Sequence, residues 1–537
     1  NMQETNKYWG YYTTIFVSFF LNFQSFIGTG ILLTPIFLAK GGFLPFLIMC
    51  TYHMIINFLF IDVFIEGMQR CDVANQILHK QKQLENLKEE EEEKKIEETL
   101  LLDEDAEQED EEEQGEQRRQ IIEAAPESDT EIAHKSLDEE RRQPLLINKR
   151  LKKVVSLTPG IDLFTIGKLT LHPSILYLYN TLIVLSSIGL VVTYSITGSQ
   201  SIVELISQPS YVSQYIVTPY TLLLTGFVIF AYFIIHQFIS FVTVVKASAL
   251  SILVIIIGII SFKVNSPHWI NFQYIFETYA VNSVMMNAAF LLLPQIYARV
   301  NPKKTHVRAF KYASLTSLFI CFLLILCWCF FVIRIVPQTG EISLGASFDK
   351  GEASIVPISQ IIKKHYPQFI FIVDLCNFFV VLSVTLSFLS YGGSLRHTAD
   401  GFIKSLMEMK EAGEKGQSKF GYLLHKMDCL GHLDIVLQGS AYVFLFSIVV
   451  LLAQLAAKYV QHFFDIFIGI TLNVASFIVV CSMIRASYKY GALDIPLAHN
   501  PILLKVLHGI LLVSFFISSL FCMVYPPLKF FKPTMPF

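Results

Sequence analysis

The sequence predicts an all-α integral membrane protein with about eleven transmembrane helices. Of its 537 residues, 53% are hydrophobic and 46 are Phe, a composition that excludes an ordinary soluble domain. Most charged residues gather between about 80 and 153, whereas the apolar segments are nearly free of charge. These apolar segments repeatedly reach the length of about 20 residues that an α-helix needs to cross a bilayer.

The apolar segments define the predicted spans one after another. In chain order they are residues 12–39, 44–67, 174–197, 219–241, 247–263, 273–297, 312–336, 368–391, 434–457, 463–484 and 503–525. An odd number of spans places the two chain ends on opposite sides of the membrane. The segment 299–311 holds five Lys and Arg residues, whereas 198–220 holds none. The positive-inside rule therefore puts the N-terminus on the cytosolic side.

The charged stretch divides the chain into three parts. Residues 1–70 hold the first two spans, 71–160 form an acidic insertion on the cytosolic side, and 161–537 hold spans three to eleven. The insertion is rich in Glu, Lys, Gln and Leu, so it can form a charged helix, or it can stay unfolded because it buries little apolar surface. It is either a solvated tether or, over residues 80–150, a docking arm for a basic protein partner.

The first span is predicted to be interrupted near the middle of the membrane. Gly28, Thr29 and Gly30 follow the polar pair Gln24 and Ser25, at a depth where lipid offers no hydrogen bonds. Freed backbone groups there must face protein or a water-filled cavity. The amide end of a broken helix attracts carboxylate, and its carbonyl end attracts cations. The alternative is a small-residue surface for close helix packing.

Several short motifs, in order along the chain, resemble the amino acid/auxin permease family. The segment Phe26–Leu32, followed by Pro35 and by Gly41 and Gly42, is similar to the opening signature of that family. The third helix of that family, with the segment before it, resembles the stretch of this chain that holds Asp162, Leu163, Gly167, Lys168, Gly189 and Tyr194. The exit of its sixth helix is matched by Leu293 and Pro294, then Asn301 and Pro302.

This resemblance implies an inverted-repeat (5+5) transporter fold with one additional C-terminal helix. Helices one and six would be broken at a central site, and the chain would move amino acids with protons or sodium by alternating access. The resemblance further implies that Gly28, Thr29 and Gly30 offer backbone groups to the amino acid. Tyr194 and Asn287 would line the opposite wall.

The sixth span departs from the family pattern. Where the family has an aromatic residue, a polar or acidic residue and a glycine, this chain has Met286, Asn287 and Ala288, and no glycine occurs between Trp269 and Arg308. A break here would lack the usual backbone relief. Asn287 either contacts a ligand or forms a hydrogen bond between helices.

For a coupling ion, the eighth span offers three hydroxyl residues. Ser383, Thr385 and Ser387 are similar to the hydroxyls that hold sodium in this fold together with carbonyls of helix one. Their spacing, however, places them on different faces of a helix, and such hydroxyls often bond their own backbone.

Proton coupling instead needs a titratable group in the cavity. The candidates within the spans are His53, His236 and Asp374, although the sequence places none of them beside the break in helix one. Asp62 and Glu66 stand near a predicted helix end, where snorkelling or capping accounts for them.

Nothing in the sequence predicts catalysis, a metal, a cofactor or nucleic-acid binding, because no phosphate-binding loop, nucleophile elbow or zinc-protease motif occurs. The leading hypothesis is a cation-coupled carrier of amino acids or similar small zwitterions. The alternative is a transport-inactive subunit of a larger membrane complex, and a nutrient sensor is a third possibility. Because the chain has no Asn-x-Ser/Thr sequon, a vacuolar, lysosomal or other organellar membrane is favoured over the plasma membrane, with the mitochondrial inner membrane as a further alternative.

Overall fold

A computed structural model describes most of the chain. The described residues are 9–27, 30–113, 161–206, 212–230, 232–261, 269–272, 275–350, 354–414, 433–459 and 461–531. Within these ranges the regular structure is helical and no β-strand occurs. The all-α class predicted from the sequence is therefore confirmed for the described part.

The helices follow the apolar segments of the sequence closely. The first five are α1 (Tyr11–Phe26), α2 (Gly30–Gly41), α3 (Phe43–Glu113), α5 (Leu163–Thr170) and α6 (Pro173–Leu205). The next group comprises α7 (Ser213–Phe230), α8 (Tyr232–Ser261), α9 (Ile275–Asn287), the 3-10 helix η4 (Ala288–Leu291), α10 (Leu293–Tyr297) and α11 (Lys304–Ile335). The last are α12 (Leu344–Lys350), α13 (Ile355–His365), η5 (Pro367–Phe369), α14 (Phe371–Glu414), α16 (Leu433–Tyr459), α17 (Gln461–Lys489) and α18 (Pro501–Phe531).

Nine of the described helices are long and apolar enough to cross a membrane. The chain is therefore a multi-pass integral membrane protein, as its composition predicted. The two other expected spans, 12–39 and 273–297, are each divided into shorter pieces. The first consists of α1 and α2, and the second of α9, η4 and α10.

The predicted boundary between the fourth and fifth spans is wrong. We expected spans at 219–241 and 247–263, but α7 ends at Phe230 and α8 already begins at Tyr232. Between about 221 and 261 the sequence is almost continuously apolar, so hydropathy alone gives no signal for where α7 ends and α8 begins. The consequence is that Lys246, which the prediction left between two spans, lies in the middle of α8.

The third helix continues well past its predicted end at residue 67. It runs unbroken to Glu113, through the start of the acidic insertion. By its internal contacts the segment Asp72–Pro159 forms a unit separate from the rest of the chain. Of the two alternatives for the insertion, its described part, 72–113, is a charged helix.

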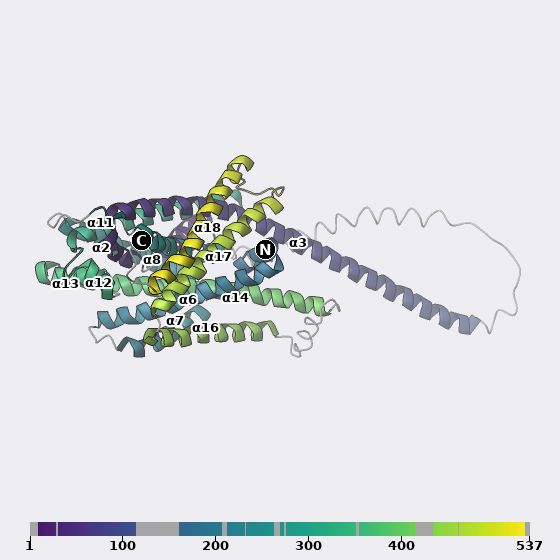
Figure 1. Ribbon diagram of the computed structural model, residues 1–537. Coiled ribbons are helices and arrows are strands. Elements are labelled where there is room, and N and C mark those ends of the chain that lie inside the picture. Colours follow the sequence, from purple (N-terminus) through teal and green to yellow (C-terminus); the bar gives the residue numbers. More distant parts are fainter. Residues whose placement is uncertain are drawn as a thin grey trace. The chain divides into compact units, whose positions relative to one another are not determined.

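The second unit, Met2–Cys71 with Gly160–Phe537, is a bundle in which helices distant in sequence pack together. In this unit α1 packs on α11, α6 on α14, and α17 on α18 (Figure 1). Helix α8 contacts α1, α11 and α14. Large apolar side chains such as Leu223, Phe230 and Phe241 point outward, which is the arrangement expected where hydrocarbon is the solvent.

Candidate functional site

The first expected span is interrupted between α1 and α2. At Ile27, the residue that follows α1, the backbone has φ −97° and ψ 66° and leaves the helical conformation. Helix α2 then begins at Gly30. Because the helix stops, carbonyl groups of its last turn lose their partners within the helix. Gly28 and Thr29 lie outside the described residues, and Gly30 is described only as the first residue of α2.

A buried lysine fills the need for a hydrogen-bond donor at this helix end. The Nζ atom of Lys246 donates to Oε1 of Gln24 at 2.6 Å and to the carbonyl oxygen of Ile27. The side chain of Lys246 is 0% exposed. A cation is favourable at the C-terminal end of a helix, where the macrodipole is negative. Sequence reasoning missed Lys246 because it placed the residue outside the spans.

Hydroxyl groups of α14 continue the polar network from Gln24. The Nε2 atom of Gln24 donates to Oγ of Ser387 at 2.9 Å and lies 3.5 Å from the carbonyl oxygen of Ser383. Ser383 and Ser387 are four residues apart and so share one face of the helix. The hydroxyl of Ser383 is buried and has no hydrogen-bond partner among the described residues. Thr385 points elsewhere and bonds the hydroxyl of Tyr220 at 3.0 Å.

Two tyrosines complete this cluster. The ring of Tyr194 on α6 stacks on the ring of Tyr391 on α14, with centroids 5.7 Å apart. The hydroxyl of Tyr194 lies beside Ser387, and the hydroxyl of Tyr391 is 3.5 Å from the carbonyl oxygen of Ser25. Tyr194, which the family resemblance suggested, therefore lies next to the interruption in the first span.

The electrostatic character of this cluster is positive. Neutral oxygen atoms of Gln24 and Ile27, rather than a carboxylate, surround the ammonium of Lys246 in the part of the chain that the structure describes. The ring of Phe379 lies 6.0 Å away and adds a weak cation–π contact. An anionic group approaching this point would be attracted, and a metal cation would meet a like charge.

The sixth expected span is also interrupted, although it has no glycine. Helix α9 ends at Asn287, and the 3-10 helix η4 follows before α10 begins at Leu293. We expected a break here to lack backbone relief. A 3-10 turn tightens the chain without any left-handed residue, and Oγ of Ser394 on α14 donates to the carbonyl oxygen of Leu291 at 2.6 Å. Helix α14 thus supports both interruptions.

Some expected site residues have contacts outside this cluster. Asn287 donates through Nδ2 to Oδ1 of Asn473 on α17 at 2.9 Å, which is the bond between helices that we had considered as its alternative role. Asp374 is exposed in the first turn of α14, nine residues before Ser383 and thus about 13 Å away along the helix axis. The structure therefore gathers Tyr194, Ser383 and Ser387, but not these two.

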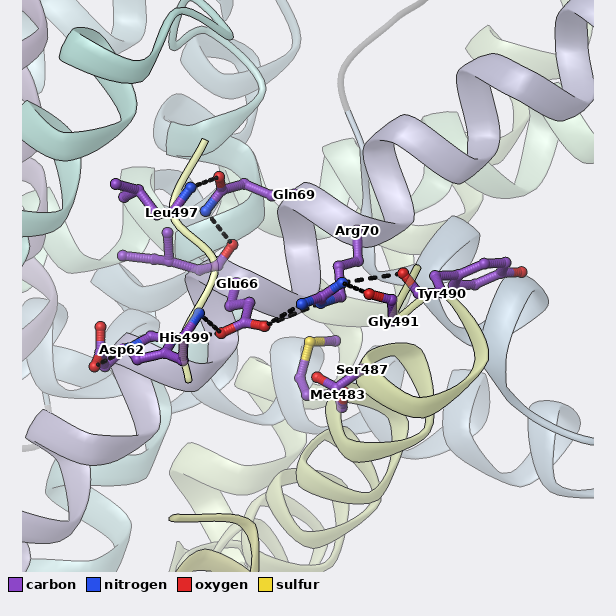
Figure 2. Close-up of polar contacts among 11 residues, drawn as sticks. Asp62, Glu66, Gln69, Arg70, Met483, Ser487, Tyr490, Gly491, Leu497 and His499 are labelled. Carbon is purple, nitrogen blue, oxygen red and sulfur yellow. Dashed lines mark hydrogen bonds and ion pairs between the residues drawn. The ribbon is translucent and has the colours of Figure 1, made fainter. Parts of the chain in front are cut away.

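A second group of charged residues lies where α3 passes the loop between α17 and α18 (Figure 2). Glu66 is 1% exposed and accepts hydrogen bonds from Nε and Nη2 of Arg70, at 3.0 and 2.7 Å. Nη1 of Arg70 donates to the carbonyl oxygens of Tyr490 and Gly491, at 3.0 and 3.1 Å. The expectation that Glu66 merely caps a helix or reaches for water is wrong, because it is buried against its partners.

His499 joins the two carboxylates of this group. Its Nε2 lies 2.8 Å from Oδ2 of Asp62, and its Nδ1 contacts Oε2 of Glu66. Lys311 on α11 also pairs with Asp62. The hydrogen bonds that its ring donates to both carboxylates raise the pKa of His499 to about 9, so its imidazole carries two protons at neutral pH. We call Asp62, Glu66, Arg70, Lys311 and His499 the ion cluster.

Comparison with known proteins adds no identification. No protein-family model matches the chain, and no curated protein sequence matches it.

Proposed function

We propose that this protein is a secondary active transporter of amino acids or similar small zwitterions, coupled to protons and working by alternating access. The observation that supports it most strongly is the buried ammonium of Lys246, bonded to the open carbonyl end of an interrupted membrane helix. Such a group at such a place is costly in a membrane and is a typical mark of a transport pathway.

The interruptions supply the groups that would hold a zwitterion. The amide end of α2 begins at Gly30 and would attract the substrate carboxylate, together with the backbone of Gly28 and Thr29. The carbonyl oxygen of Ile27 at the end of α1 is bonded to the ammonium of Lys246, so the substrate amine would lie away from it. Tyr194 would form part of the wall. Asn287 is not included in this site, because its amide is bonded to Asn473.

The inverted-repeat fold is part of the same proposal. The first interrupted helix, made of α1 and α2, would be the first helix of one repeat. The second interrupted helix, made of α9, η4 and α10, would be the first helix of the other repeat. Both contact α14, through Gln24 with Ser387 and through Leu291 with Ser394. A displacement of α14 would therefore change both interruptions together, which is what alternating access requires.

Protons are favoured over sodium because of where the lysine charge lies. A sodium ion held by the carbonyl of Ile27 and the hydroxyls of Ser383 and Ser387 would occupy the region that the ammonium of Lys246 fills. Loss of a proton from Lys246 would leave two N–H groups, enough for both hydrogen bonds, but would remove the charge that strengthens them and the attraction to the helix end. The contact between α8 and α1 would then loosen.

Uptake into proteoliposomes tests this proposal. We expect a neutral amino acid to accumulate when the bath is more acidic than the lumen, and to accumulate equally with sodium or choline as the bath cation. Accumulation that requires sodium would contradict the proton coupling. If no amino acid of any class moves under either gradient, the transporter proposal itself fails.

The acidic helix keeps a second function open, that of a transport-inactive subunit of a larger, organellar or mitochondrial, membrane complex. Residues 85–113 contain 17 Asp and Glu and three Lys, a charge suited to docking a basic protein partner. Purification in mild detergent at low and at high salt distinguishes the two. A stoichiometric complex would favour the subunit, and a monodisperse monomer that transports would exclude it.

A further inference from the structure

A small pocket is formed by residues of α3, α9 and α18, and no residue of the cluster around Lys246 lines it. It is lined by Tyr52, His53 and Ile56 of α3, Tyr279 and Asn287 of α9, and Ser514, Phe515 and Ser518 of α18. Its volume is about 10 Å³, the room of one water-sized group. Nothing in the transport proposal uses this pocket apart from Asn287, which it leaves bonded to Asn473.

A polar atom of the pocket wall lacks a partner. His53 is 3% exposed, and its Nε2 atom is buried without a hydrogen bond among the described residues. The hydroxyl of Tyr279 lies near Ser518 but forms no hydrogen bond of normal geometry. The rings of His53 and Tyr279 are adjacent, with centroids 4.8 Å apart. Leaving such a buried group unpaired is unfavourable, because it loses its hydrogen bonds to water and gains none in exchange.

The other nitrogen of His53 fixes what this partner must be. Nδ1 lies 2.9 Å from the carbonyl oxygen of Met49, and a carbonyl only accepts, so Nδ1 carries the proton. In the neutral imidazole Nε2 is then a bare acceptor. None of the described lining residues carries a carboxylate that would stabilise a charged ring. The missing partner is therefore a hydrogen-bond donor.

We propose that this pocket binds one hydroxyl group, which donates to Nε2 of His53 and bonds the hydroxyl of Tyr279. The hydroxyl belongs either to water or to a membrane-soluble alcohol such as a sterol. Apolar residues within one helical turn of the lining residues on the same three helices are half exposed, namely Ile55, Phe276 and Ile517 at 49%, 49% and 51%. A molecule could therefore enter from the hydrocarbon phase with its hydroxyl end foremost.

Thermal unfolding of the full chain in sterol-free nanodiscs tests the site and its source. The probes are cholesterol and cholesterol methyl ether, in which a methyl group replaces the donor proton. We expect cholesterol to raise Tm and the methyl ether to leave it unchanged. Tyr279→Phe should weaken the apparent affinity for cholesterol about tenfold, and His53→Phe should abolish the shift. The exposed Tyr215→Phe is the matched control and should respond as the unchanged protein does.

The water source is decided by a high-resolution map of the same particles. If neither sterol shifts Tm and an ordered water lies within hydrogen-bond distance of Nε2 of His53, the hydroxyl site stands with water as its ligand. Equal shifts from cholesterol and its methyl ether would overturn the proposal, as would a map in which Nε2 of His53 bonds a protein group. All these readouts are independent of transport, so they separate this proposal from the transporter proposal.

Discussion

Nζ of Lys246 lies 2.6 Å from Oε1 of Gln24, so a cation in the middle of α8 is bonded to the last turn of α1, 222 residues away in sequence. The other amide atom of Gln24, Nε2, donates a hydrogen bond to Oγ of Ser387 on α14. Three helices are therefore joined at one buried amide side chain. In an apolar interior each of these bonds counts strongly, because no water replaces a lost partner.

Ser387→Ala should weaken this junction. It removes the 2.9 Å hydrogen bond to Nε2 of Gln24 and should cost about 1 kcal/mol of stability, together with a lower uptake rate. Ser390→Ala is the matched control, because the Ser390 hydroxyl bonds only the Leu386 carbonyl of its own helix in the described contacts. Thermal unfolding and proteoliposome uptake measure both effects. Equal losses in the two variants would show that Ser387 has no special role.

The contact between α6 and α7 can be tested with two glycines. A Cβ atom at Gly198 would lie 2.4 Å from the ring of Tyr220, so Gly198→Ala should destabilise the protein by about 1–3 kcal/mol. A Cβ atom at Gly226 would meet nothing within 4 Å, so Gly226→Ala should leave stability unchanged or slightly raised. Thermal unfolding in detergent distinguishes the two. A stable Gly198→Ala protein would contradict the packing of Tyr220 against α6.

The ion cluster should make stability depend on alkaline pH. The folded-state pKa of His499 is about 9, raised from 6.5 by Asp62 and Glu66. Since the raised pKa means that folding favours the protonated ring, its stabilisation is fully present below pH 6.5 and is lost as pH rises through 9. Tm should therefore fall over this range.

His499→Gln should lower Tm at pH 6 and flatten its decline between pH 6.5 and 9, because the titrating ring is gone. His365→Gln, at the exposed end of α13, is the control and should keep the slope of the unchanged protein. If His499→Gln and the unchanged protein decline in parallel, the ring does not carry the linkage.

The sequence was sufficient for the all-α, multi-pass membrane class of the described part of the chain, for a clear physical reason. A bilayer demands long apolar helices, so the apolar runs in the sequence indicate where the long helices lie. The polar residues within the run 12–39 indicate that this span is interrupted. The sequence could not locate the end of α7 at Phe230 and the start of α8 at Tyr232, because the residues on both sides are equally apolar. Nor could it foresee the length of α3, since Glu, Lys and Leu suit a solvated helix as well as an unfolded segment.

The candidate site was predicted only in part. Ser383 and Ser387 were predicted as ion-coupling residues, and they lie beside Gln24, which the sequence marked only as a polar residue before the interruption. Their link to Lys246 could not be predicted, because hydropathy contains no information on contacts between residues far apart in sequence. For the sixth span, the absence of glycine was a poor guide, since a 3-10 turn with Ser394 as donor satisfies the backbone instead.

Substrate-driven proton entry into proteoliposomes, followed with a trapped pH-sensitive dye, tests the central claim most directly. The unchanged protein should acidify the lumen when a transported amino acid is added outside. Lys246→Gln should abolish this acidification, or reduce it at least about tenfold. Lys364→Gln, which removes a charge from the exposed face of α13, should acidify normally. Full acidification by folded Lys246→Gln protein would contradict the account.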